Sequence, residues 1–523
     1  PETGEKIAVS HMIPRSREDL ARRHKALRAV AEYSVGLMGR TPDYMNVTYA
    51  GFAGSPVEWG GNGNEAGYER LVAYQKFLRR NDISLTHTIV QPTVDKATGD
   101  APVAGNEHAL RKVGVTSNGI VVRGARVLAT LAPFADEIAV YPASPLPQGA
   151  DAYALSFCIP MSTPGLKFLC RDSVSASSNL FDHPLSSRFD EQDAFVIFDD
   201  VEVPRERLFI DCNLKLYNSV MTTNWPPNIQ QQTMIRASVK LDFAWGLALR
   251  MAASINAADP ETMRMIGELW GYAEFTRSAI VAAEAEAREW PGGLWTGASA
   301  PLHALRAFLP LWMPRANEIL RLIGSHNLLA APMAAELADK DLRPLIDKYL
   351  PGAKGQAAEE RIRIFRLAWD FAGSALASRN EQYERFYLAS SPRNLARHLA
   401  FTDRSGADRL VDRFLKDASE VDVDVVSDGA DVVVTGSRFT SSSRSRAGCV
   451  DRSGVRLNLV VLAGKPRGKP LDGSLELGIE IDEVAQLFGK PCKRDLLVDP
   501  SPLEFLYATI SEIHGGIVAC EGG

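Results

Sequence analysis

Two long stretches of helical periodicity flank a block of short β-type segments in this chain of 523 residues. Between residues 85 and 210, runs of β-branched or aromatic residues are bounded by turn residues, a pattern typical of strands. The runs are residues 88–90, 119–122, 154–157 and 194–198. Asn118-Gly119 marks a tight turn before the second run. The helical, β, helical order predicts an α+β chain with several domains.

The helical stretches carry their own signals. The first runs from residue 16 to residue 78 and is interrupted at residues 39–42, Gly-Arg-Thr-Pro. The second follows residue 224, and in it Asp259-Pro260 supplies an N-cap and an N1 proline. Apolar residues spaced along one face predict two of its long helices, with Met263, Ile266 and Trp270 in one, and Ile362, Phe365, Trp369 and Leu376 in the other.

These patterns divide the chain into four expected parts. They are an N-terminal helical domain at residues 1–84, a central β domain at 85–215, a C-terminal helical bundle at 216–416 and a β-rich appendage at 417–523. The appendage is expected because Val421, Val423 and Val425 alternate with acids, and because Asp428-Gly429 then turns the chain. A second alternation runs from Leu475 to Ile481. No function is assigned to the appendage.

The composition excludes several classes of protein. Hydrophobic residues make up 46% and charged residues 23% of the chain, as in ordinary globular proteins. A net charge of −6 without a polybasic cluster argues against nucleic acid and membrane partners and favours a small molecule. The six cysteines lack CxxC spacing, so we expect reduced thiols and no metal site. No apolar signal segment opens the chain, and a cytoplasmic location is the expectation.

Four motifs place polar, charged and glycine residues in a fixed order. They read GRTPDY at residues 39–44, HTIVQP at 87–92, DHPLSSRFDE at 182–191, and GS at 373–374 followed by RNEQYER at 379–385. In sequence and spacing they resemble the oxygenase component family of 4-hydroxyphenylacetate 3-monooxygenase. The resemblance covers residues 7–417, about four-fifths of the chain.

The resemblance implies a fold and a reaction. The fold is acyl-CoA dehydrogenase-like, with the β domain closed into a barrel between the two helical domains. The reaction is ortho-hydroxylation of a phenol to a catechol through a C4a-hydroperoxyflavin, with FAD supplied as FADH2 and with O2 as oxidant. The chain has no GxGxxG or Walker motif, so a separate NAD(P)H-flavin reductase is the expected partner in a two-component system. The family also implies a homotetramer.

Arg40, Tyr44 and His87 are the candidate catalytic residues. A phenol becomes a better carbon nucleophile as its proton leaves, and a guanidinium with an imidazole of ordinary pKa near 6.5 favours that ionisation. In the resembled family the matching residues contact the phenol hydroxyl and the reactive flavin oxygen. The plainer interpretation is a helix-flanking arginine, a packed tyrosine and a core histidine, which the spacing of the set disfavours.

Three further segments match the flavin contacts of the family. Residues 87–93 are expected along the isoalloxazine, Thr130 is a second contact, and residues 377–380 match a flavin-binding turn in which Arg379 neutralises the pyrophosphate. The expected cofactor-binding residues are His87, Thr88, Val90, Gln91, Thr93, Thr130, Ala377, Ser378, Arg379 and Asn380.

Substrate selection is expected in the loop at residues 174–180, which matches the part of the family that varies with substrate. Its small polar candidates are Ser175, Ser177, Ser178 and Asn179. The phenol itself stays open between 4-hydroxyphenylacetate, a chlorophenol and a tyrosine-derived intermediate. Arg188 and Asp190 are interpreted as a structural salt bridge in a charged turn rather than as a catalytic pair.

Three alternative functions remain. An acyl-CoA dehydrogenase-like flavoenzyme would need a carboxylate base, for which Glu381 or Glu384 lies in the right region. A 4-hydroxybutyryl-CoA dehydratase would need cluster-binding cysteines, which are absent near Arg40 and across residues 213–448. A non-catalytic flavin or aromatic binder would not need the trio of Arg40, Tyr44 and His87.

Overall fold

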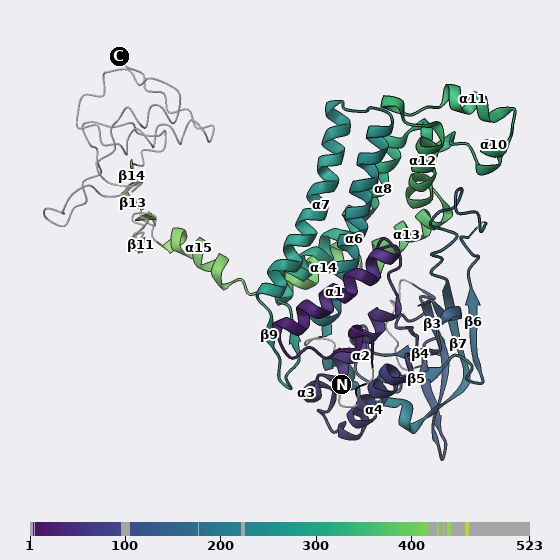
Figure 1. Cartoon of the computed structure of the whole chain (residues 1–523). Helices are drawn as coiled ribbons and strands as arrows, with labels where there is room; N and C mark the ends of the chain where they lie inside the picture. The colour runs from purple at the N-terminus through teal and green to yellow at the C-terminus, as the bar shows by residue number, and fades with distance from the viewer. Residues whose placement is uncertain are drawn as a thin grey trace. The chain divides into compact units, whose positions relative to one another are not determined.

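A computed structural model describes residue 4 and residues 6–95, 105–175, 177–220 and 225–416, together with four short strands beyond them. The chain divides into two compact units, Pro1–Phe401 and Thr402–Gly523. The first unit contains helices, then two sheets, then more helices, in the order that the sequence predicts (Figure 1). No described helix is long and apolar enough to cross a membrane.

Four helices open the first unit: α1 (Arg17–Tyr33), α2 (Pro42–Ala53), α3 (Pro56–Trp59) and α4 (Glu65–Asn81). The Ser16 side chain caps α1 by accepting a hydrogen bond from the Asp19 amide. Helix α2 begins at Pro42, whose fixed φ suits the first helical position. The helix is buried from Asp43 to Ala53 because it packs between α4, α6 and β1. The break at residues 39–42 therefore leads into the centre of the unit.

The central strands form two four-stranded sheets. One has the order β1 (Leu85–His87), β4 (Glu137–Val140), β5 (Leu155–Pro160) and β8 (Leu208–Asp211). The other has the order β2 (Arg111–Val115), β3 (Gly119–Thr130), β7 (Asp193–Pro204) and β6 (Leu166–Cys170). Strands β1 and β4 are parallel, and the other neighbours are antiparallel. The fully buried Phe157 of one sheet packs edge-on against Phe198 of the other, so a shared core joins the sheets.

The predicted strand at residues 88–90 is wrong. Strand β1 ends at His87, and the chain then leaves the sheet with only the Thr88 amide bonded to the Ala139 carbonyl and an isolated bridge from Val90 to Val127. The tight turn predicted at Asn118-Gly119 is confirmed, because it joins β2 to β3. The segment after His87 is therefore extended chain whose backbone is largely outside the sheet.

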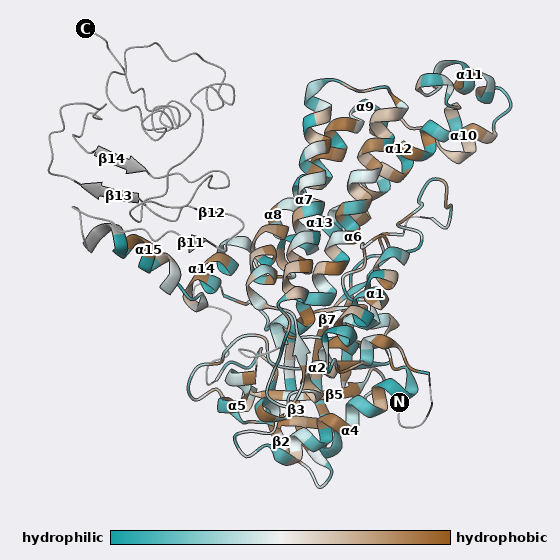
Figure 2. Ribbon diagram, turned by 60° about the vertical axis from the view of Figure 1, so that its left-hand side comes forward, coloured by the Kyte–Doolittle hydropathy of each residue, from teal (hydrophilic) through white to brown (hydrophobic). Residues whose placement is uncertain are grey.

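Long helices form a bundle after the sheets. They are α6 (Trp225–Ser254), α7 (Pro260–Ala285), α8 (Ser299–Gly324), α12 (Ala358–Ala372), α13 (Ala375–Phe386) and α14 (Ser391–Phe401). The shorter elements around them are α5 (Leu214–Ser219), α9 (His326–Leu329), α10 (Ala334–Ala338), α11 (Leu342–Tyr349), β9 (Arg288–Glu289) and β10 (Trp295–Thr296). Figure 2 shows bands of apolar and polar residues along the bundle helices, as expected for amphipathic helices.

Two details of the predicted helices need correction. The Asp259 cap of α7 is confirmed, but Met263 and Trp270 are about half exposed, and the buried stripe instead contains Met265, Ile266 and Leu269. The predicted helix through Ile362 and Leu376 is two helices, α12 and α13. They separate at Gly373-Ser374, where the Ser374 side chain caps α13.

The second unit contains helix α15 (Ser405–Lys416) and two antiparallel strand pairs. Strand β11 (Val426–Ser427) pairs with β12 (Val432–Val433). The turn predicted at residues 428–429 lies outside the described residues. Strand β13 (Ser437–Thr440) pairs with β14 (Arg456–Leu459). The second predicted alternation, from Leu475 to Ile481, lies outside the described residues.

Candidate active site

The structure brings Arg40, Tyr44 and His87 together. Arg40 lies just before α2, Tyr44 lies in its first turn, and His87 ends β1, against which α2 packs. The Arg40 guanidinium carbon is 4.0 Å from the centre of the Tyr44 ring, and the Tyr44 and His87 rings are stacked with centres 5.5 Å apart. A cation, a phenol side chain and an imidazole thus share one buried location.

Aromatic side chains of α13 and of its C-cap residue Tyr387 complete the surroundings of Arg40. Its guanidinium carbon lies 5.6 Å from the Tyr383 ring centre and 5.1 Å from that of Tyr387, and these two rings stack at 4.7 Å. Gly39 allows this approach, because a Cβ there would come within 2.5 Å of the Tyr383 ring. Cation–π contacts with several rings hold the guanidinium plane. The Tyr383 hydroxyl is buried and has no hydrogen-bond partner among the described residues.

The surroundings of His87 favour its neutral form. It is buried, its Nδ1 is 3.1 Å from the Met45 sulfur, and its ring centre is 5.4 Å from that of Tyr141. Burial, reinforced by the Arg40 charge, lowers the pKa of His87 well below its ordinary 6.5. The ordinary pKa expected from sequence is therefore wrong, because that expectation ignored burial beside a cation. A neutral imidazole can still accept or donate a hydrogen bond.

We predict that the His87 imidazole becomes protonated only well below the pH at which an unperturbed histidine is half protonated, near pH 6.5. Nuclear magnetic resonance of protein with labelled histidine, assigned with His87→Gln, measures this. A His87 signal that moves with a midpoint near the ordinary value would contradict the site geometry.

Tyr141 is a site residue that the sequence motifs did not reveal. It is fully buried, lies directly after β4, and couples electrostatically to Tyr44 and Arg40. Burial raises the pKa of its hydroxyl well above 10.0. Because β1 and β4 are parallel and pair His87 with Ala139, their ends meet at one edge. A polar aromatic residue after the neighbouring strand was the available signal, but it required knowledge of the strand pairing.

The segment that follows His87 has the features expected of a ligand-contacting strip. The Thr88 hydroxyl is buried without a hydrogen-bond partner among the described residues, and Gln91 is also buried. Val90 is 46% exposed and Thr93 is exposed. Buried polar groups in proteins are normally hydrogen-bonded, so the Thr88 hydroxyl is suited to a bound polar molecule.

Asp193 connects two of the other predicted flavin residues. It accepts hydrogen bonds from the Thr130 hydroxyl at 2.9 Å and from Arg379 Nη2 and Nε at 2.6 and 2.8 Å. Arg379 also pairs with Glu191 at 2.8 Å, and Glu191 accepts from the Arg40 amide at 2.5 Å. The guanidinium predicted to neutralise a pyrophosphate is thus already paired with two carboxylates, and it links α13 to the chain around Arg40.

Residues 377–380 form part of a helix rather than the predicted turn. They lie at the start of α13, where the Ala377 amide donates to the Ser374 side chain. Ser378 is exposed, and Asn380 is buried with its amide nitrogen unpartnered among the described residues. A helix start directs unpaired backbone amides outward and favours anionic groups. The site residues therefore still fit a phosphate-containing cofactor, through the helix start rather than through Arg379.

In the substrate loop, residues 175 and 177–180 are exposed, and Val174 is half-buried against the core. The Val174 amide donates to Asp190, while Asn179 donates to Asp182 at 3.0 Å. Ser175, Ser177 and Ser178 are exposed. These contacts fix both ends of the loop and leave its serines accessible.

The predicted ion pair between Arg188 and Asp190 is wrong, because Asp190 pairs with a different arginine. Asp190 pairs with Arg171 at 2.7 Å and accepts a hydrogen bond from the Ser173 hydroxyl at 2.6 Å. Arg188 is exposed. The structural rather than catalytic interpretation of Asp190 agrees with these contacts.

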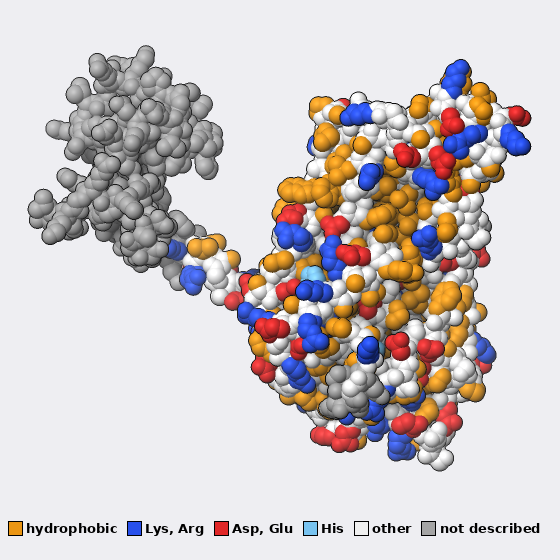
Figure 3. All heavy atoms as spheres, viewed as in Figure 1, with side chains coloured by type: hydrophobic (Ala, Val, Ile, Leu, Met, Phe, Trp, Pro, Cys, Tyr) orange, Lys and Arg blue, Asp and Glu red, His pale blue; other side chains and the backbone are white. Residues whose placement is uncertain are grey.

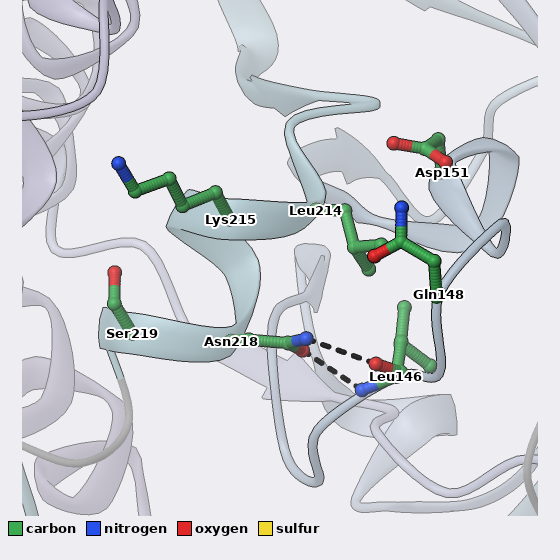
Figure 4. Close-up of a pocket in the computed structure, with 7 residues that line it drawn as sticks. All are labelled: Leu146, Gln148, Asp151, Leu214, Lys215, Asn218 and Ser219. Carbon is green, nitrogen blue, oxygen red and sulfur yellow. Dashed lines mark hydrogen bonds between the residues drawn. The ribbon is translucent and has the colours of Figure 1, made fainter.

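A separate pocket lies between α5 and the loop at residues 146–151 (Figure 4). The Asn218 side chain bridges the two by bonding to the amide and the carbonyl of Leu146 at 2.8 and 2.9 Å. The pocket is also lined by Gln148, Asp151, Leu214, Lys215 and Ser219. None of these residues belongs to the predicted site.

Comparisons with known proteins identify relatives over most of the chain. Residues 1–210 match the model of the 4-hydroxyphenylacetate 3-hydroxylase N terminal, and residues 218–416 match that of its C terminal. The 4-hydroxyphenylacetate 3-monooxygenase oxygenase component of Thermus thermophilus is 36% identical over 397 residues, which cover 75% of this chain and 80% of that protein.

Two solved structures share the fold. An oxygenase component of 4-hydroxyphenylacetate 3-monooxygenase complexed with FAD and 4-hydroxyphenylacetate is 35% identical, with a TM-score of 0.76 over 80% of this chain and 87% of that one. An oxygen-tolerant 4-hydroxybutyryl-CoA dehydratase from N. maritimus is 16% identical, with a TM-score of 0.71 over 83% and 85% of the two chains. The second likeness concerns the fold alone.

The fold, the buried cationic and aromatic site and these relatives together define a flavin-dependent aromatic monooxygenase that uses FAD. The chain belongs to the 4-hydroxyphenylacetate 3-hydroxylase family. The family predicted from the four motifs is therefore confirmed.

Glu381 and Glu384, the two candidate bases for an acyl-CoA dehydrogenase-like reaction, are both held in ion pairs. Glu384 is buried and bound by Arg236 and Lys240, whose charges outweigh the effect of burial and lower its pKa to about 2. Glu381 pairs with Arg321 and Arg385. A carboxylate with a strongly lowered pKa is a weak base, so Glu384 is unsuited to abstracting a proton from an acyl-CoA. The described residues contain no group of three His, Cys, Asp or Glu that could hold a metal.

Proposed function

We propose that this chain hydroxylates a phenol at the position ortho to its hydroxyl group, as the oxygenase component of a two-component system with a separate flavin reductase. The proposal rests mainly on the cluster of the half-buried Arg40 with the buried Tyr44 and His87, in which the guanidinium lies over the Tyr44 ring. Reduced FAD, when bound, supplies the chemistry that activates O2 and transfers one oxygen atom. The chain itself binds, orients and ionises the phenol.

Arg40 stabilises the phenolate oxygen in this proposal. Its guanidinium is enclosed by tyrosine rings and has no carboxylate ion pair among the described residues, so its N–H groups can serve an anionic oxygen. The charge lowers the phenol pKa directly. Neutral His87 accepts the phenol hydrogen bond, while Tyr44 and Tyr141 exclude water and hold the ring. The low pKa of His87 makes Arg40, rather than the imidazole, the main source of phenol activation.

Residues 87–93 and the start of α13 are the proposed flavin contacts. Thr88 and Asn380 each have a buried polar atom that is unpartnered among the described residues, and both lie in the segments predicted for FAD. The other proposed contacts are His87, Val90, Gln91, Thr93, Thr130, Ala377 and Ser378. Arg379 acts here as a positioning residue, because its ion pairs to Asp193 and Glu191 join these segments.

The first test supplies the full-length protein with chemically reduced FAD, O2 and a panel of phenols, and measures the products. We expect catechols from at least one phenol, and we expect His87→Ala to impair hydroxylation more than FAD binding. Equal loss of both would make His87 a cofactor-docking residue. A wild-type protein that binds FAD and yields no catechol from any phenol would overturn the proposed function.

We also propose that the two sheets form the barrel-like centre of an acyl-CoA dehydrogenase-like chain, with domains at residues 1–84, 85–215 and 216–416. The shared core of the sheets supports this subdivision. Residues 417–523 form the proposed fourth part.

A homotetramer is the proposed assembly, and the apolar surface of α7 and α8 supports it. Figure 3 shows apolar side chains gathered along the bundle helices. Trp270 is 52%, Phe275 66% and Leu311 52% exposed. Phe275 contacts a ring cluster around Trp312, which stacks on Tyr272 at 5.0 Å. Exposed apolar patches of this kind mark protein interfaces.

Replacing Phe275 with glutamate is therefore expected to reduce the assembly to smaller species, because a charge would be buried at the contact. Light scattering coupled to gel filtration measures the mass. Val115→Glu is the matched control, since Val115 is an apolar residue of β2 that is 68% exposed. An unchanged mass for the Phe275 variant, or equal effects of both changes, would place the interface elsewhere.

A further inference from the structure

Arg126 is a buried cation directly beneath the proposed flavin strip. It lies on β3 and is 1% exposed. Its Nη1 donates to the Ile89 carbonyl at 2.9 Å, and the Gln91 side-chain oxygen, when it faces the guanidinium, accepts from both Nη atoms at 3.1 Å. Tyr217 of α5 contributes a further hydrogen bond. Arg126 thus holds the two ends of residues 89–91.

No carboxylate pairs with Arg126 among the described residues. The contrast with Arg123, on the same strand, is direct, because Arg123 is exposed and pairs with Asp200 through two hydrogen bonds of 2.8 Å. Burial lowers the pKa of Arg126, but a guanidinium keeps its charge at neutral pH. An unpaired buried charge is costly, and it favours an anion placed nearby.

The two oxidation states of the flavin differ in the charge that such a cation would meet. The isoalloxazine of oxidised FAD is neutral, whereas that of reduced FAD loses its N1 proton near neutral pH and becomes anionic. A fixed cation behind the ring therefore lowers the free energy of the bound reduced form and leaves that of the bound oxidised form nearly unchanged. Only such differential binding changes the preference between two states.

We propose that Arg126 is the residue that makes this chain select reduced FAD over oxidised FAD. The inference rests on the proposed function, in which residues 87–93 contact the isoalloxazine. Selection of this kind suits an oxygenase that receives its flavin from another protein, because it favours capture of the reduced cofactor and release of the oxidised one. The charge of Arg126 provides the preference, while its hydrogen bonds fix the strip.

The test measures the dissociation constants of oxidised FAD and, under anaerobic conditions, of reduced FAD for four proteins. In the wild type we expect tighter binding of reduced FAD. Arg126→Gln should diminish this preference by about tenfold, the order of magnitude expected when one unit charge is removed from a site with an effective dielectric constant of about 20. Arg126→Lys keeps the charge and should keep the preference, even if both forms bind more weakly. Arg123→Gln should change neither constant.

Equal weakening of both forms by Arg126→Gln would show that Arg126 only supports the strip, and would overturn the inference. A wild type that binds neither form would instead count against the proposed function. Titration of reduced FAD on the wild-type protein gives a second measurement that needs no variant. We expect the N1 pKa of bound reduced FAD to lie below that of the free cofactor, and an unchanged or raised value would also overturn the inference.

Discussion

Arg40→Gln should lower kcat/KM for phenol hydroxylation by about 10²–10³-fold, the loss expected when one preorganised group that stabilises a developing oxyanion is removed. The loss should fall mainly on kcat, because the phenolate charge that Arg40 meets grows as the ring is activated. Catechol formation at saturating O2 and reduced FAD measures the effect. Arg22→Gln is the matched control, since Arg22 is an exposed arginine that pairs with Asp19.

A binding measurement separates this role from a general loss of structure. 4-Nitrophenol absorbs differently as phenol and as phenolate, so its pKa can be followed on the protein without any reaction. The wild type should lower the pKa of the bound phenol, and Arg40→Gln should remove that lowering. A variant that binds 4-nitrophenol with the same lowered pKa would contradict the role given to Arg40.

The largest expected effect on stability comes from Glu384→Gln. Glu384 accepts from Arg236 at 2.7 Å and from Lys240 at 2.8 Å, and all three side chains are buried. The change leaves two buried cations without their counter-charge, and breaking a buried pair in this way costs about 3–5 kcal/mol. Chemical denaturation measures the free energy of unfolding. Glu381→Gln, which removes more exposed ion pairs on the same helix, should cost about 1 kcal/mol or less.

The contribution of Glu384 to the free energy of unfolding should decrease at acidic pH. The folded-state pKa of Glu384, about 2, lies below its ordinary 4.5, so unfolding takes up a proton between these values. Its stabilisation is complete above pH 4.5 and is lost as the pH falls toward 2. The difference in stability between wild type and Glu384→Gln should therefore shrink over that range. A difference that stays constant would show that Glu384 is not ionised in the fold.

Local sequence patterns predicted the elements whose causes are local. The cap at Asp259 and the turn at Asn118-Gly119 depend on neighbouring residues, and both are confirmed. The exposed face of α7 was misjudged because Trp270 and Met263 are apolar yet lie on the surface. Periodicity shows that apolar residues share a face, but it does not show which face the rest of the fold covers.

The candidate site was predicted where the motifs carried the residues, and missed where contacts join distant segments. Arg40, Tyr44 and His87 lie together. Tyr141 lies outside the motifs and enters the site through strand pairing, while Tyr383 belongs to the fourth motif but received no role, because helix packing brings it to Arg40. The ion pairs of Arg379 and the hydrogen bonds of Arg126 could not be predicted for the same reason, because their partners are far away in the sequence. The pKa of His87 could not be predicted either, because it depends on burial. Tertiary contacts set these properties.

The most direct test of the proposed hydroxylation is a single turnover with isotopically labelled oxygen. The wild-type protein is loaded anaerobically with reduced FAD and a phenol, then mixed with ¹⁸O₂, and the product is analysed by mass spectrometry. The balanced reaction consumes one phenol, one O2 and one FADH2 and yields one catechol, one water and one FAD. We predict a catechol that carries one ¹⁸O atom ortho to the original hydroxyl. Flavin oxidation without catechol, or a catechol whose new oxygen comes from water, would contradict the account.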